Sequence, residues 1–119
     1  MRYMFLVYSV EAAAAKESFQ QVAEAHGRVM AEASAQGILE KAEPLKPTST
    51  ATTVRTSNGG TVIVDGPFAE TKEQLAGFYI LDCQDLDEAI EWAKRIPTMC
   101  KGTNGCIEIR PVAQLPKRP

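Results

Sequence analysis

The chain has 119 residues, of which 45% are hydrophobic and 24% charged, with a formal net charge of −2 at pH 7. These values are typical of one soluble domain with a modest core, and the absence of a basic stripe disfavours binding to nucleic acid or to an anionic membrane surface. No apolar run approaches the roughly 20 residues of a membrane span and no signal-peptide pattern follows Met1, so we expect a cytoplasmic protein.

The first predicted element is a continuous apolar strand over residues 3–8. Residues 9–15 lead into a long helix that ends near Gln36, with Gly37 as its C′ residue. Side chains that recur at helical spacing predict its buried face: Phe19, Val22, Ala23, His26, Val29, Met30 and Ala33. A second strand is predicted over residues 38–45, where prolines begin to interrupt the chain.

Residues 51–56 and 61–64 predict two strands joined by Ser-Asn-Gly-Gly, a sequence typical of a hairpin turn. Because residues 61–64 are strongly apolar, we interpret the second strand as buried. Asp65-Gly66-Pro67-Phe68 then ends it in a rigid turn, since glycine tolerates unusual backbone angles and proline fixes its own φ. We expect this segment, the 65–68 turn, to lie at the lip of a sheet.

The second half of the sequence predicts a helical turn over residues 70–75, an apolar strand over 77–83 and a last strand over 105–112. Between these strands, Asp85 and Glu88 form a capping-box-like pattern that begins a second helix. We expect this helix to bury Leu86, Ala89, Ile90 and Ala93, and to leave Trp92 off its apolar stripe as a candidate interface residue.

The order of elements is βαββαβ with an inserted hairpin, which predicts an α+β, ferredoxin-like fold. We expect a single domain over residues 1–112 and a flexible C-terminal tail over 113–119. Residues 3–8 and 78–81 are apolar on both faces of their strands, which indicates a sheet that is covered on both sides. Two helices cover one face, so a second copy of the sheet is the economical cover for the other. The sequence therefore predicts a homodimer with its sheets face to face.

The three cysteines, Cys83, Cys100 and Cys106, form no CxxC pair, and their odd number argues against a disulfide framework. With a single histidine, a Cys/His zinc site would need all three to converge, so we favour reduced thiols and expect no metal or cofactor. The sequence has no motif for an activated nucleophile, a phosphate-binding loop or a dinucleotide site. Any catalysis is therefore expected to be acid/base chemistry on a bound small molecule.

Two residues are catalytic candidates. His26 is the one side chain whose ordinary pKa lies near neutrality, although a histidine on an apolar helix face is also common in packing. Asp65 follows an apolar strand, so its carboxylate either faces a cavity or caps the turn by bonding nearby N–H groups.

The candidate ligand contacts are Phe68, Glu70, Lys72, Tyr8 and Arg55. For Phe68 we favour a core anchor over a stacking platform. Glu70 and Lys72 are each typical of a solvated charge cluster, but the nearness of Lys72 to Asp65 and Glu70 is also a pattern found at functional sites. Tyr8 and Arg55 lie on strands, as does Tyr79, and a one-residue register shift would reverse the direction of each.

The segment Val-Asp-Gly-Pro-Phe-Ala-Glu-Thr-Lys-Glu-Gln-Leu-Ala-Gly-Phe-Tyr, residues 64–79, resembles the hallmark of the YCII-related family in its Asp-Gly-Pro-Phe branch. The resemblance extends over residues 3–8, 50–55, 85–93 and 107–112. It implies a dimeric α+β barrel, a bacterial origin and frequent genetic association with extracytoplasmic-function sigma factors, but no general reaction. In shorter relatives, a helix-one histidine is proposed to act with an aspartate that precedes a proline. Here that position is Ile96, so the dyad is broken.

Three functions fit these observations. The favoured one is a small-molecule-binding homodimer, with cofactor-free acid/base catalysis in a cleft near the 65–68 turn as its catalytic form. The alternative is a non-catalytic regulatory or partner-binding module that docks a protein such as a sigma factor. In the third, the turn serves folding alone.

Overall fold

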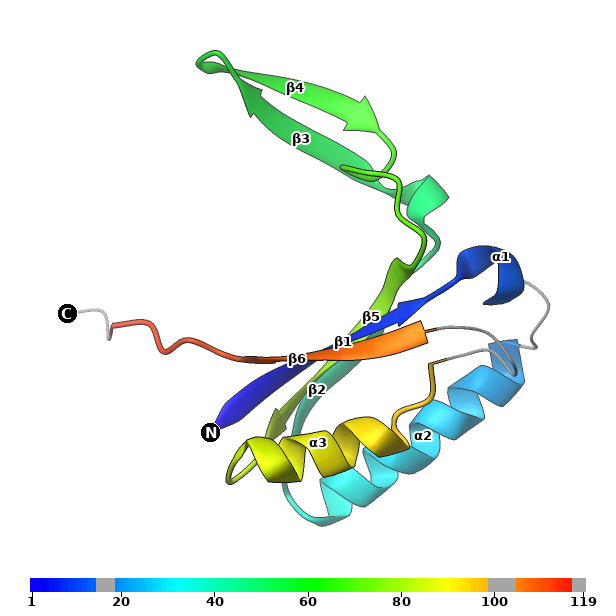
Figure 1. Ribbon diagram of the computed structural model, residues 1–119, viewed down its shortest axis with the longest axis vertical. Coiled ribbons are helices and arrows are strands. Elements are labelled where there is room, and N and C mark those ends of the chain that lie inside the picture. The colour runs from blue at the N-terminus through cyan, green and yellow to red at the C-terminus, as the bar shows by residue number, and fades with distance from the viewer. Residues whose placement is uncertain (15–18, 99–104, 117–119) are drawn as a thin grey trace.

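The computed structural model describes residues 1–14, 19–98 and 105–116, and consists of a helix-covered sheet and a projecting hairpin (Figure 1). The sheet has four antiparallel strands in the order β2-β5-β1-β6. Their bounds are β1 (Arg2–Ser9), β2 (Leu39–Pro44), β5 (Gln74–Asp82) and β6 (Gly105–Pro111). The long helices α2 (Phe19–Ala35) and α3 (Leu86–Arg95) lie on one side of this sheet. The predicted α+β, ferredoxin-like arrangement is confirmed.

Short elements complete the described chain. The helix α1 (Glu11–Ala14) follows β1, and the 3₁₀ helix η1 (Thr48–Thr50) precedes the hairpin. The hairpin consists of β3 (Thr52–Ser57) and β4 (Gly60–Asp65), inserted between β2 and β5 as the sequence predicted. The helical turn predicted over residues 70–75 is wrong, because β5 already begins at Gln74 and its first residues pair with the end of β1.

The core fills the space between the helices and the sheet. Burial alternates along β1 and β5, whose helix-facing residues are Tyr3, Phe5, Val7, Ser9, Tyr79 and Leu81. They form one core with Val29 and Ala33 of α2 and with Ala89 and Trp92 of α3. This alternation is what one covered sheet face requires.

The buried stripe of α3 differs from the predicted one. Trp92 is 4% exposed and belongs to the core, so its prediction as an interface residue is wrong. Ala89 is buried as predicted, but Leu86 and Ile90 are 52% and 37% exposed. The stripe runs instead through Ala89, Trp92 and Ile96, which recur at the i, i+3, i+7 spacing of a helix face. The small side chain of Ala89 leaves room for the indole, and sequence spacing does not distinguish these two stripes.

The sheet face opposite the helices, which we call the open face, is apolar at its centre. Directly paired residues of antiparallel strands point to the same side. The pairings therefore gather six apolar side chains there: Met4, Leu6, Tyr8, Leu75, Phe78 and Ile80. Charged residues of the edge strands flank them on both sides: Lys41, Glu43, Glu108 and Arg110. Both long helices lie on the other side of the sheet, so neither covers this surface.

Strands β3 and β4, which we call the hairpin arm, project away from the helices as a separate two-stranded ribbon (Figure 1). Every residue of β4 is exposed, so the prediction of a buried strand is wrong within one protomer. The prediction of a strand over residues 61–64 is confirmed, but the body of the same chain does not cover this strand. The radius of gyration is 16.3 Å, whereas a compact domain of this length would have about 13.5 Å.

Candidate functional site

The 65–68 turn folds back over one face of the hairpin arm. Gly66 adopts a φ of 113°, which favours glycine, and its N–H donates to the Ala51 carbonyl over 2.7 Å. Thr53 Oγ1 donates to the Gly66 carbonyl over 2.7 Å, and Arg55 Nη2 donates to the Phe68 carbonyl over 2.6 Å. The turn is thus held by backbone carbonyls that accept from two side chains of β3.

The structure brings Arg55 to the turn but does not assemble the other predicted residues around it. Phe68 is 71% exposed, so its prediction as a core anchor is wrong within the protomer. Among the described residues, the side chains of Asp65, Glu70 and Lys72 form no hydrogen bond or ion pair with one another. Tyr8 lies on the open face beside Leu75.

His26 lies elsewhere, between α2 and the sheet. Its Nδ1 atom is 2.6 Å from Oη of Tyr79, and the two ring centroids are 5.8 Å apart. Helical spacing places His26 on the same side of α2 as the buried Val29 and Ala33, while Tyr79 points toward the helices from β5. The two side chains therefore meet across the helix–sheet interface.

Burial keeps both members of this pair uncharged at neutral pH. Desolvation lowers the pKa of His26 below its ordinary value and raises the pKa of Tyr79 to about 12. Which group donates the hydrogen bond depends on the imidazole tautomer. Within the described part of the chain, the other ring nitrogen, Nε2, has no hydrogen-bond partner. The pair thus holds the imidazole ring through one of its two nitrogens.

The lowered pKa of His26 predicts how stability depends on pH. The unfolded chain binds a proton near pH 6.5, whereas the folded chain binds it only at lower pH. We expect the free energy of unfolding to be highest above pH 6.5 and to fall as the pH drops through the lowered folded pKa. His26→Asn keeps a hydrogen-bonding group near Nδ1 but does not titrate, so urea titrations between pH 5 and about 7 should show a flatter profile. Identical profiles for the two proteins would contradict a buried neutral His26.

The position at which the resemblance would place the aspartate of the dyad is occupied by Ile96. This residue ends α3 and is 4% exposed within the core. The partner of His26 is instead Tyr79, a pairing that the sequence did not reveal. A usable signal was the alternation along β5, where Tyr79 shares its face with the buried Gly77 and Leu81.

Glu11 is a second residue whose role the sequence did not indicate. Its carboxylate accepts from the Thr48 N–H over 2.7 Å and from Thr48 Oγ1 over 2.8 Å. Its own N–H donates to Oε1 of Gln74 over 2.9 Å. Glu11 thereby ties η1 and the start of β5 to α1, and so fixes the base of the hairpin arm.

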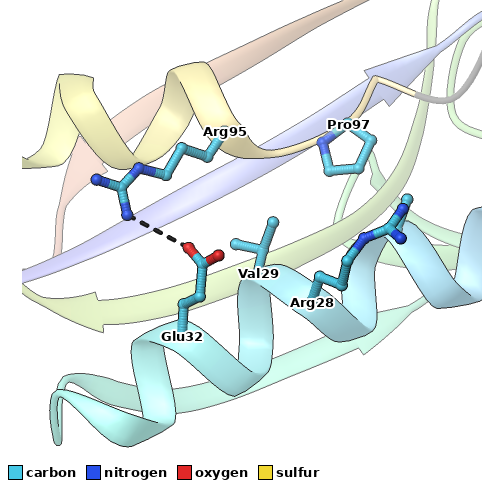
Figure 2. Close-up of a pocket in the computed structure, with 6 residues that line it drawn as sticks. Arg28, Val29, Glu32, Arg95 and Pro97 are labelled. Carbon is cyan, nitrogen blue, oxygen red and sulfur yellow. Dashed lines mark hydrogen bonds and ion pairs between the residues drawn. The ribbon is translucent and has the colours of Figure 1, made fainter.

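A groove of about 280 Å³ lies between α2 and the end of α3 (Figure 2). Figure 2 shows Arg95 reaching toward Glu32, with Nη1 and Oε2 3.4 Å apart, while Arg28 lies farther along α2. The Arg95 guanidinium also lies 4.6 Å from the centre of the Trp92 ring. Exposed ion pairs of this kind contribute little stability. Neither His26 nor Tyr79 lines the groove, so it is separate from the pair.

Metal ligands, reactive thiols and membrane-spanning helices also bear on the function of the part of the chain that the structure describes. There, no group of three or more His, Cys, Asp or Glu side chains is arranged to hold a metal ion. Cys83 and Cys106 are free, and burial raises the pKa of the Cys83 thiol to about 11. Cys100 lies outside the described residues. None of the helices in those ranges is both long and apolar enough to span a membrane.

Two comparisons with known proteins identify the family of this chain. The family model of the YCII-related domain matches residues 1–116. An uncharacterized protein of Rhizobium meliloti (strain 1021) is 42% identical over 116 residues, which cover 95% of this chain and 93% of that protein. The chain therefore belongs to the YCII-related family.

Proposed function

We propose that this protein is a homodimer that binds a small molecule beside the His26–Tyr79 pair. The observation that carries the proposal is the 2.6 Å contact between Nδ1 and Oη, which joins two polar groups across a largely apolar interface. Polar groups are costly to bury unless they are paired, and pairing through one nitrogen fixes the orientation of the ring and so the position of the other nitrogen. Perturbed pKa values in such a setting are common at functional sites.

The tautomer of His26 decides what the pair does for a ligand. With the proton on Nδ1, this nitrogen donates to Tyr79 and the lone pair of Nε2 acts as a general base. With the proton on Nε2, Tyr79 donates to Nδ1 and the Nε2–H group donates to the ligand. The first arrangement supports cofactor-free acid/base catalysis, and the second supports binding alone.

The open face supports the homodimer. The accessible surface of the chain is 8700 Å², whereas a compact monomer of this mass would expose about 6,300 Å². The excess is similar to the area that each partner buries in a large, permanent interface. A second sheet packed face to face would cover the six apolar side chains.

The charges that flank the open face favour one arrangement of two copies. Lys41 and Arg110 lie at the level of the Met4–Ile80 pair, whereas Glu43 and Glu108 lie at the level of the next pair on this face. A two-fold axis that lies between the two sheets, perpendicular to the strands and midway between these levels, places the positive side chains of each copy over the negative side chains of the other. An axis along the strands would place like charges over each other, which is unfavourable.

A thermal-shift screen against a metabolite library tests the ligand site. A ligand at a hundredfold excess over its dissociation constant stabilises the protein by about 2.7 kcal/mol. Tyr79→Phe removes the hydroxyl and should weaken the binding of a hit by about 5- to 10-fold, the effect of one hydrogen bond. Tyr3→Phe is the matched control, because Tyr3 is also buried but its hydroxyl forms no hydrogen bond among the described residues.

The same screen separates the alternatives. Equal affinity in wild type and Tyr79→Phe would contradict a site at this pair. A hit that is lost in Asp65→Asn and kept in Tyr79→Phe would move the site to the 65–68 turn, where the sequence placed it. A library without hits would favour the partner-binding module.

The partner-binding alternative draws its support from exposed apolar side chains on the arm and turn, Phe68 above all. In this function the turn would dock a protein such as an extracytoplasmic-function sigma factor. We also propose that the chain belongs to the Asp-Gly-Pro-Phe branch of its family and acts in the cytoplasm of a bacterium. Copurification of one specific protein in place of a small-molecule ligand would support the alternative.

A further inference from the structure

The two faces of the hairpin arm differ in what covers them. Thr53 and Arg55 point to one face, and both donate to carbonyls of the 65–68 turn, which lies over that face. Val54 and Ile63 are cross-strand partners on the other face, which we call the outer face. They are 63% and 72% exposed. The turn thus lies over one side of the ribbon, where Val62 and Val64 remain 48% and 45% exposed, and leaves the outer face bare.

The outer face has the composition of a contact surface. Beside the Val54–Ile63 pair, it carries the Thr56–Thr61 pair, so its four central side chains are all β-branched and none of the four is charged. A two-stranded ribbon alone is marginally stable in water and needs a further apolar surface. Exposed apolar patches of this kind mark interaction sites.

The base of the arm is fixed to the body. The Leu45 N–H donates to the Ala76 carbonyl over 2.8 Å, and the Glu11 carboxylate holds η1 immediately before β3. The arm leaves the sheet where β2 ends and returns where β5 begins, and both strands border the open face. A second copy that sits on the open face therefore lies beside the arm.

We propose that the outer face of the hairpin arm packs against a second copy of this chain. This inference rests on the proposed homodimer and adds the arm to its interface. The large accessible surface and large radius of gyration support it, because both exceed the values of a compact monomer of this size. The uncharged centre of the outer face suits an apolar surface of the partner, while Asp65 lies on the same face at the base of the arm.

The test compares two double variants of the full chain by sedimentation equilibrium. Val54→Thr with Ile63→Thr makes the outer face polar, and threonine retains the β-branching that suits a strand. Val62→Thr with Val64→Thr is the matched control on the covered face. We expect the outer-face variant to raise the dimer dissociation constant by about 10- to 100-fold, because each dimer loses apolar contacts at four positions. The control should change it by less than about threefold.

The outcomes separate the arm from the dimer. Equal dissociation constants for the outer-face variant and wild type would overturn the arm proposal and leave the homodimer standing. A larger effect of the control would overturn the assignment of the outer face. A monomeric wild type would overturn the arm and the homodimer together, while ligand binding at the His26–Tyr79 pair is measured independently. Hydrogen exchange of the β1 and β5 amides verifies that each variant retains its folded body.

Discussion

Leu6→Lys is expected to convert the proposed homodimer into a monomer. Leu6 lies at the centre of the open face, opposite Phe78 on one side and Glu108 on the other. In a monomer the new ammonium group reaches water beside Glu108, so the body should retain its fold. In the dimer two such charges would be removed from water, and burying an unpaired charge is very unfavourable. We expect the dissociation constant to rise more than about 1,000-fold.

Light scattering at low micromolar concentration measures this change as a halved mass. Leu86→Lys is the control, because this leucine is 52% exposed on α3, away from the open face, and its replacement should leave the mass unchanged. A dimeric Leu6→Lys variant would show that the open face is not the interface. A monomeric wild type would refute the homodimer itself.

Gly77→Ala is expected to lower the free energy of unfolding by about 1–3 kcal/mol, as overpacking of a tight site does. A Cβ atom on Gly77 would lie 2.7 Å from the Glu43 carbonyl oxygen and 3.2 Å from Cα of Pro44. Both are backbone atoms of β2, so relief requires the edge strand to move away from β5. Because the arm begins just after β2, the same variant should also loosen the base of the arm.

Urea unfolding measures this loss, and Gly60→Ala supplies the comparison. A Cβ atom there would meet its nearest neighbour, the Ser57 carbonyl oxygen, at the ordinary contact distance of 3.7 Å. We expect this control to change stability by less than about 1 kcal/mol. Equal stability of Gly77→Ala and wild type would show that β2 is not held against β5 at this distance.

The fold was predictable because its signals are local. The apolar strands, the hairpin turn and the Asp85 cap each depend on a few adjacent residues, and the Asp85 side chain accepts from the Glu88 N–H as expected. The burial of individual side chains was less predictable, because it depends on which other elements of the fold pack against them. The sequence predicts residues 61–64 and Phe68 to be buried, yet they are exposed on the arm and the turn. On α3, Trp92 lies in the core, whereas Leu86, which was predicted there, is exposed.

Some residues of the candidate site could likewise be predicted from local sequence, and others could not. His26 was found from its chemistry alone, since it is the single histidine of the chain. Its partner, Tyr79, required the register of β5 against α2, which a sequence without a structure does not fix. The residues predicted around Asp65 are close in sequence, but among the described residues the side chains of Asp65, Glu70 and Lys72 form no hydrogen bond or ion pair with one another.

The hairpin arm is joined to the rest of the chain at neighbouring points, because Thr52 and Asp65 are cross-strand partners at its base. Residues can therefore be added to or removed from both strands beyond this pair without altering the four-stranded sheet, and each added pair lengthens the arm by about 3.4 Å. The length of the arm can thus change independently of the rest of the fold. If the arm packs against a second copy, two related chains in one cell whose arms differ in length would each form the best-fitting dimer with an identical chain. Mixed dimers would then be disfavoured without any change to the sheet or to the His26–Tyr79 pair.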